Sequence, residues 1–214
     1  IDLGTNTIGR LGLTKAEFDL VNCGRLRVGS GTAGAMDISA TIVRSSPLSL
    51  INASAITESI SAGLTAPALR ISSTGPVNLA QANGVTTLAA STTASFTLSN
   101  GDKALVVGTV DGVTGVTTSN SDITLTSNLL AIQQALNAGT GALTLQPFRD
   151  AWGVDLGDGF APGGFTALRG SWPERARSDR PPLTGSILRD GRPVSPTPPK
   201  RSYGFRPGAR TSAL

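Results

Sequence analysis

Apolar and polar residues alternate in short runs along most of this chain. From about residue 26 to residue 146, apolar residues stand in pairs two positions apart, and most pairs are separated by a Ser, Thr, Asn or Arg. A period of two is the pattern of a strand that buries one face. Turn-forming stretches such as Asn83-Gly84 lie between the runs. We therefore expect short strands whose inward side chains are Leu26/Val28, Leu48/Leu50, Leu69/Ile71, Val77/Leu79, Leu88/Ala90, Phe96/Leu98, Leu105/Val107, Ile123/Leu125 and Leu143/Leu145.

The spacing of these pairs suggests how the strands are arranged. From Leu69 to Leu105 the pairs follow one another at short, similar steps, and the steps to Ile123 and then to Leu143 are about twice as long. The sequence at residues 123–126 also recurs in similar form at residues 143–146. A unit of roughly 18–20 residues holding two or more strands matches one coil of a solenoid.

A second architecture fits the spacing alone, because an antiparallel sandwich also spaces its strands by about 8–12 residues. Very short strands, scarce aromatic residues and few hairpin turns decide against it. They favour an all-β fold of the right-handed parallel β-helix type.

Two segments have helical rather than strand character. In residues 13–18, Thr14 can cap a helix, Glu17 completes a capping box, and Leu13 can pack on Phe18 as a hydrophobic staple. Gly24 then supplies a stop. The second segment, residues 128–136, consists of good helix formers and ends at Asn137 and Gly139. The pattern predicts a helix in each.

A longer repeat divides the chain. Residues 1–4, Ile-Asp-Leu-Gly, reappear as Val-Asp-Leu-Gly at residues 154–157. The two matches flank the strand-rich block, so one large repeat is expected to be whole and a second to begin at Val154. The expected parts are a repeat junction with a short capped helix (1–25), a β-helix strand block (26–150), the start of a second junction (151–165) and a basic tail (166–214). Together with the start at Ile1, this predicts an internal or truncated piece of a longer protein.

The composition agrees with stacked layers that leave little volume to fill. Gly, Ser, Thr and Ala dominate, whereas aromatic residues are 4% and charged residues 15% of the chain. Charge is unevenly divided: residues 1–164 carry 8 Lys and Arg against 11 Asp and Glu, and residues 165–214 carry 10 against 3. The excess positive charge therefore belongs to the C-terminal segment.

The last segment, residues 166–214, loses the alternation and is rich in Pro and Arg, so we expect a disordered tail without a core. It has two interpretations. One is a basic linker, and the other is out-of-frame translation of a GC-rich gene, which yields Arg, Pro, Ser and Gly. We favour the second because the new repeat is interrupted just as it begins.

Candidate chemistry is sparse, and we predict no catalytic, cofactor-binding or metal-binding residue. The chain has no His, so a Ser-His triad or a His-based metal site is excluded. Its single cysteine, Cys23, cannot form an internal disulfide and is expected to be a small packed residue. The densest acidic group is Asp150, Asp155 and Asp158, which could serve sugar hydrolysis or bind Ca²⁺. Its Gly-rich setting favours turn-forming carboxylates instead.

The basic tail could attract nucleic acid or an anionic membrane. Tyr203 and Phe205 stand beside Lys200, Arg201 and Arg206, an arrangement that could stack on bases. No folded recognition module accompanies them, so we expect no nucleic-acid partner. No apolar stretch is long enough for a membrane-spanning helix, and no signal peptide is expected.

The junction sequence resembles that of filamentous-haemagglutinin-like large bacterial adhesins, which are β-strand-repeat surface proteins. The matching stretches are I-D-L-G (residues 1–4), L-G-L-T-K-A-E-F-D (11–19) and G-R-L-R-V-G (24–29). In the family a D-L-G stretch leads to an L-T-x-x-E-L-like helical turn and then a G-x-L-x-I-G strand. Here Phe18 stands where Leu is more usual, and Cys23 where a small residue is usual. The second junction, at residues 154–165, begins in the same way and then departs from the pattern.

The resemblance extends along the chain as far as Phe165 and implies a function without catalysis. Such proteins are exported across both membranes of Gram-negative bacteria and form β-helical fibres. We therefore expect a structural repeat segment of a secreted or outer membrane-associated adhesin, active in cell adhesion or aggregation, and not an enzyme. Expected partners are receptors or glycans on host or neighbouring cells, and other copies joined through sheet edges; no cofactor is expected. The alternative is a β-helical polysaccharide-active domain, a lyase or hydrolase.

Overall fold

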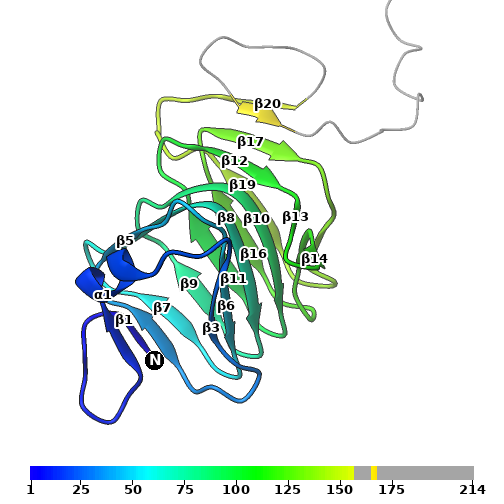
Figure 1. Cartoon of the computed structure of the whole chain (residues 1–214). Helices are drawn as coiled ribbons and strands as arrows, with labels where there is room; N and C mark the ends of the chain where they lie inside the picture. Colours follow the sequence, from blue (N-terminus) through cyan, green and yellow to red (C-terminus); the bar gives the residue numbers. More distant parts are fainter. Residues whose placement is uncertain (157–164, 168–214) are drawn as a thin grey trace, which may run out of the picture. The chain divides into compact units, whose positions relative to one another are not determined.

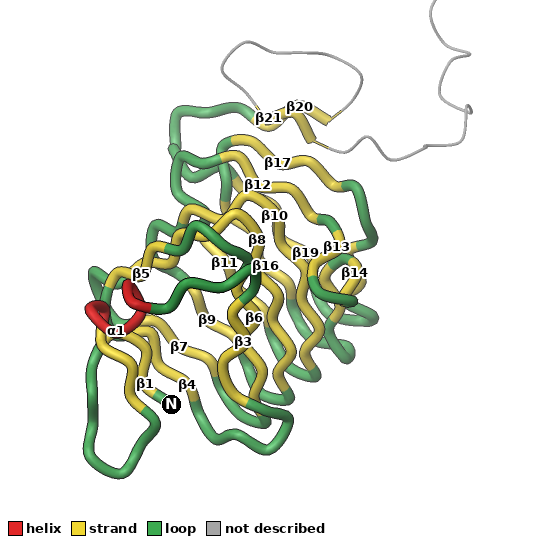
Figure 2. The backbone as a smooth tube through the Cα atoms, in the orientation of Figure 1, coloured by secondary structure: helices red, strands yellow, loops and turns green. Residues whose placement is uncertain are grey.

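A computed structural model describes residues 1–156 and 165–167, which fold as a parallel β-helix of about six turns (Figures 1 and 2). The chain winds through two long sheets, so each turn adds one strand to each sheet. This confirms the all-β solenoid that the strand spacing predicts. The predicted tail, residues 166–214, lies outside the described residues except for residues 166 and 167.

The first sheet has eight strands, and all the pairings within it are parallel. In spatial order they are β2 (Gly12–Thr14), β1 (Asp2–Gly4), β4 (Met36–Ile38), β7 (Ile56–Glu58), β9 (Val77–Leu79), β11 (Phe96–Ser99), β16 (Ile123–Thr126) and β19 (Leu143–Gln146).

The second sheet has nine strands and is also parallel. Its main path is β3 (Leu26–Gly29), β6 (Leu48–Asn52), β8 (Gly63–Ser73), β10 (Gly84–Thr92), β12 (Ala104–Val107) and β17 (Leu129–Ile132). Three short strands extend it: β5 (Thr41–Val43) pairs with β8, and β15 (Val116–Thr117) pairs with β10 and β18 (Leu136–Asn137).

The core contains most of the inward pairs expected from the sequence, together with buried residues that were not predicted, such as Met36, Ile38 and Leu64. In parallel coils, like residues stack on one another, so each inward position becomes a continuous row. One row of the first sheet runs Val77, Phe96, Ile123, Leu143 by register, and the Ile123–Leu143 pairing is the one that the recurrence of residues 123–126 predicts. The interior members of these rows are fully buried, whereas Leu143, on the terminal strand β19, is 45% exposed.

Asparagine side chains close one corner of successive coils. Asn83, Asn100 and Asn128 each follow a strand of the first sheet and precede a strand of the second, and all three are buried. The Asn100 Oδ1 accepts from the Val85 amide at 2.7 Å, and its Nδ2 donates to the carbonyls of Val85, Lys103 and Ala104. A tight corner leaves backbone groups without sheet partners, and these amides supply them.

The first predicted helix is present as α1 (Lys15–Leu20) with the predicted capping box between Thr14 and Glu17. Arg44 holds its other end. Arg44 is 7% exposed, and its guanidinium donates from Nη1 to the Phe18 carbonyl (2.7 Å) and from Nη2 to the Val21 carbonyl (2.9 Å). These carbonyls belong to the last turn and the C-cap of α1, so a cation there also complements the helix dipole.

The second predicted helix, residues 128–136, is wrong: this segment forms β17 and β18. Leu130 and Ile132 align with Leu105 and Val107 of β12, and exposure alternates along β17. The sheet edge offered by β12 and the core below it therefore outweigh an intrinsic helix preference, which is a weak constraint on its own.

One coil contains an inserted antiparallel hairpin, β13 (Thr109–Val110) and β14 (Val113–Thr114). In the register of the first sheet, the step along the chain from Phe96 to Ile123 is longer than the step from Val77 to Phe96. The additional residues in the longer step are the inserted segment 108–115, which contains the hairpin. Asp111 and Gly112 form the turn, both at positive φ (49° and 82°), as two-residue hairpin turns of the type I′ class require.

The long sequence repeat has a structural counterpart. β1 pairs in parallel with β2, which follows it closely along the chain, and β20 (Val154–Leu156) pairs in the same way with β21 (Phe165–Ala167). The first junction is not separate from the strand block, because β1 also pairs with β4. A parallel strand pair therefore begins at each occurrence of the repeated sequence, although β1–β2 belongs to the eight-stranded sheet and β20–β21 forms a two-stranded sheet of its own.

Candidate functional site

The inserted hairpin lies over the outer face of the second sheet. β13 contacts β10 and β8, and the tip residue Asp111 reaches side chains of β8, β6 and β3. Arg27, Ser49 and Arg70 are partners in the parallel register of these strands. Because their sequence neighbours on both sides point into the core, these three side chains form an outward row.

The carboxylate of Asp111 accepts five hydrogen bonds, four from the side chains of this row and one from Arg25, which precedes β3. Its Oδ1 accepts from Arg25 Nη1 (2.6 Å) and Arg27 Nη2 (2.5 Å). Its Oδ2 accepts from Arg27 Nε (2.8 Å), Ser49 Oγ (2.8 Å) and Arg70 Nη1 (3.3 Å). The arrangement with Arg27 is the bidentate fork that guanidinium offers to carboxylate. We refer to these five residues as the Asp111 cluster.

The electrostatics of the Asp111 cluster are unbalanced. The hydrogen bond from Arg27, followed by that from Ser49, holds the pKa of Asp111 far below its usual value, although burial opposes the shift. The same contact raises the pKa of Arg27. Among the described residues Asp111 is the only carboxylate paired with any of the three arginines, so the cluster retains positive charge. Its carboxylate is 3% exposed, whereas Arg25 is 47% and Arg27 57% exposed.

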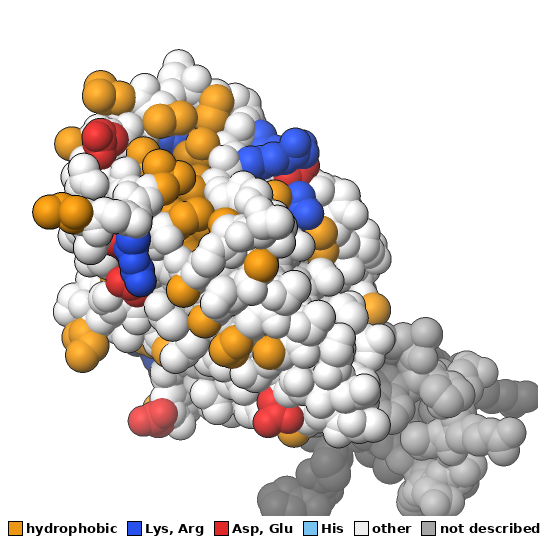
Figure 3. All heavy atoms as spheres, turned by 90° about the horizontal axis from the view of Figure 1, so that it is seen from below, with side chains coloured by type: hydrophobic (Ala, Val, Ile, Leu, Met, Phe, Trp, Pro, Cys, Tyr) orange, Lys and Arg blue, Asp and Glu red, His pale blue; other side chains and the backbone are white. Residues whose placement is uncertain are grey.

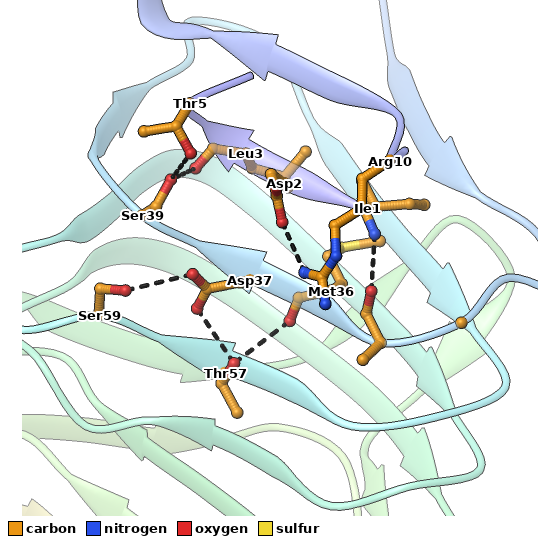
Figure 4. Close-up of polar contacts among 12 residues, drawn as sticks. Ile1, Asp2, Leu3, Thr5, Arg10, Met36, Asp37, Ser39, Thr57 and Ser59 are labelled. Carbon is orange, nitrogen blue, oxygen red and sulfur yellow. Dashed lines mark hydrogen bonds and ion pairs between the residues drawn. The ribbon is translucent and has the colours of Figure 1, made fainter. Parts of the chain in front are cut away.

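A second polar group lies on the first sheet near its N-terminal edge (Figure 4). Asp2 of β1 and Asp37 of β4 are neighbours in the parallel register. Asp2 Oδ1 accepts from Arg10 (2.7 Å), and Asp37 accepts from Thr57 (3.1 Å) and Ser59 (3.2 Å). A hydrogen bond from Thr7, followed by that from Arg10, lowers the pKa of Asp2, so Asp2 is ionised at neutral pH.

Glu58 carries the opposite pKa shift at a different position. Burial raises its pKa, while its Oε2 accepts from the Gln81 amide (2.9 Å) and Asn83 Nδ2 (3.2 Å). Glu58 follows the outward-facing Thr57 in β7, so it points to the opposite face from Thr57 and Asp37. The lowered-pKa and raised-pKa carboxyl groups therefore do not meet on one surface.

A third group links the last coils. Arg149 donates from Nε and Nη2 to Asp102 (2.6 and 2.7 Å), and Asn128 Nδ2 donates to the same carboxylate. Both charged side chains are about half exposed, and the pair is one cation to one anion. Charged side chains are few on the face seen in Figure 3, where they occur in small groups on a mostly uncharged surface.

Only two of the three acidic residues singled out from the sequence lie in the described part of the chain. Asp150 lies in an exposed turn, Asp155 is in β20, and Asp158 lies outside the described residues. Cys23 is half-buried and free, with Arg44 Nη2 3.9 Å from its sulfur. The tail residues Lys200, Arg201, Tyr203, Phe205 and Arg206 also lie outside the described residues.

The Asp111 cluster was missed in the sequence, although a local signal exists. Thr-Val-Asp-Gly-Val-Thr at residues 109–114 is an Asp-Gly turn between apolar alternations, the strongest short-range hairpin signal. Nothing local indicates that Arg25, Arg27 and Arg70 meet its tip, because they lie 41 to 86 residues away.

Across residues 1–156 and 165–167, no group of three potential metal ligands is present, and no helix is long and apolar enough to cross a bilayer. No protein-family model, curated protein or solved structure matches this chain.

Proposed function

We propose that this chain is a structural β-helical repeat segment of a secreted or surface-exposed bacterial adhesin. The carrying observation is the recurrence of the β1–β2 pair as β20–β21, at the second occurrence of the repeated sequence. A repeat that ends by starting the same parallel pair can be stacked on the next copy without changing the fold. Stacked coils contact only their neighbours, which suits a long fibre.

The surface chemistry supports a fibre over an enzyme. The outward row of the first sheet continues from Asp37 through Thr57, Asn78, Thr97 and Thr124, which are small or short polar side chains. Such a row gives a shallow, uniform face.

The alternative, a polysaccharide-active domain, is favoured by one observation, the Asp2 and Asp37 neighbours. A glycosidase needs two carboxyl groups reaching one bond, one of them protonated. Asp2 has a lowered pKa, and its side chain is only 5% exposed, so a substrate would have little access to it.

Fibre formation can be tested with proteins holding one, two and three tandem copies of residues 1–153. Stacking predicts that the melting temperature and the longest dimension from small-angle scattering both rise with copy number. Independent, unstacked units would instead keep one melting temperature, and that result would refute the fibre proposal.

The adhesive role needs a separate assay. Beads coated with the full chain should adhere to cells, and beads coated with heat-unfolded chain are the control. Equal adherence of the two preparations would contradict a role of the folded β-helix. Release of reducing ends or unsaturated sugars from acidic polysaccharides would support the alternative enzyme.

A further inference from the structure

The arginines of the Asp111 cluster carry more hydrogen-bond donors than Asp111 accepts. Arg27 Nη1 and the Nε and Nη2 of Arg25 contact no acceptor among the described residues. Both side chains are about half exposed, so these donors are open to solvent. Arg70, 19% exposed, adds a third guanidinium, and its Nε is buried without a partner in the described part of the chain.

The Asp111 cluster carries an excess of positive charge. Three guanidiniums face one carboxylate, and none of the three has a second acid partner among the described residues. Arg27 and Arg70 lie two strands apart, so their charges are separated by roughly 10 Å, which is close to the Debye length at physiological salt. Uncompensated guanidiniums in fixed positions attract planar or tetrahedral oxyanions.

We infer that the Asp111 cluster binds anionic groups of an acidic oligosaccharide, through the open edges of Arg25 and Arg27 beside the hairpin tip. The inference rests on the proposed adhesive function, which makes cell-surface glycans the relevant ligands. Asp111 shows that the same guanidinium groups pair with a carboxylate through their other donors. Exposed aromatic side chains for stacking on nucleobases are nearly absent in the described residues, where Phe148 is the one large exposed example.

The test is a titration of the full chain with trigalacturonate, followed through the arginine Nε–Hε NMR signals. This readout is local, so anions bound by the basic residues beyond 165 do not contribute to it. Saturable shifts are expected at Arg25, Arg27 and Arg70. Arg149 is the internal control, because it is equally exposed and already paired one-to-one with Asp102. Equal shifts at Arg149 would refute the site.

Three variants sharpen the test. Arg27→Gln should weaken binding about tenfold, the effect of losing one charge-assisted contact. Asp111→Asn should strengthen binding, because it removes the internal carboxylate and leaves the guanidiniums in place. Arg149→Gln should change nothing. Unchanged affinity in Arg27→Gln, with an unchanged far-ultraviolet spectrum, would overturn the inference.

Other ligands decide the chemistry of the group bound. Comparing sulfated maltotriose with trigalacturonate shows whether the site prefers a sulfate group or a carboxylate group. Binding of either anionic sugar supports the site. Equal binding of neutral maltotriose would show that charge has no role. Equal binding of triglutamate would assign the site to acidic peptides. Both results contradict the inference.

The outcomes also separate this site from the adhesive function. If coated beads adhere while neither trigalacturonate nor sulfated maltotriose shifts the cluster signals, the site is wrong and the function stands. If trigalacturonate binds but the beads do not adhere, the site stands and the adhesive function fails.

Discussion

Single buried asparagines supply the hydrogen bonds that the coil corners lack. Asn100 has no exposed surface and makes four hydrogen bonds to backbone groups of two coils. A buried peptide group that loses its partner is costly, whereas one satisfied by an amide is not. The position is therefore specific for a side chain with both donor and acceptor.

Asn100→Ala should lower the free energy of unfolding by roughly 2–4 kcal/mol, because several backbone groups are orphaned together. Asn78→Ala is the matched control, since Asn78 points outward from β9 and is exposed, and it should change stability by less than about 0.5 kcal/mol. Urea unfolding measures both. A similar loss in the two variants would contradict the corner assignment.

Glu58 is expected to oppose folding as pH rises. Because burial raises its pKa above 4.5 in the folded protein, the stability it contributes is complete below that value and is lost as pH rises through the folded pKa. Glu58→Gln keeps an acceptor for Gln81 and Asn83 and cannot ionise.

As the pH rises from about 4 to 7, the free energy of unfolding of Glu58→Gln should therefore increase relative to that of the wild type. Urea titrations at several pH values measure the difference. A difference that does not depend on pH would mean that Glu58 is as easily ionised in the folded protein as in the unfolded one.

At the level of elements, α1 is attached to the β-helix through Arg44 as well as through Phe18. Arg44→Met keeps the apolar stem but removes the guanidinium donors from the Phe18 and Val21 carbonyls, so that Phe18 keeps only the bond from the Val21 amide (3.2 Å). We expect a loss of about 2 kcal/mol and faster hydrogen exchange in α1. Lys15→Met breaks only the exposed pair with Asp19 and should cost less than about 0.5 kcal/mol. Unchanged exchange in α1 after Arg44→Met would contradict this role.

Elements whose signal is local could be predicted from the sequence, and the others could not. The capping box of Thr14 and Glu17 acts within a single helical turn, and each inward pair is set by its own alternation. The segment after Asn128 carries two local signals, helix propensity and the alternation of Leu130 and Ile132, and the edge of β12 decides between them. The Asp111 cluster depends on coils far apart in sequence, so no local pattern contains it.

For the whole molecule, position in the stack sets the energetic weight of a side chain. Leu98 and Leu145 belong to the same inward row, Leu98 fully buried between neighbours and Leu145 partly buried on the terminal strand β19. Leu98→Ala should cost about 2–5 kcal/mol. Leu145→Ala should cost about 1 kcal/mol or less, because less apolar area is removed from water there. Thermal unfolding compares them, and equal losses would contradict the layered stack.

The hairpin tip also changes how the coils would come apart under load. A stack held only by neighbouring coils peels from either end, one coil at a time. Asp111, however, joins the chain after β12 to Arg25 and Arg27, 86 and 84 residues earlier. The ion pairs of Asp111 thus link the first three coils to the coil that carries the hairpin. These coils separate only after those ion pairs break together. Tension along the axis should therefore extend the coils after β14 first, leaving the linked N-terminal half as a mechanically protected block.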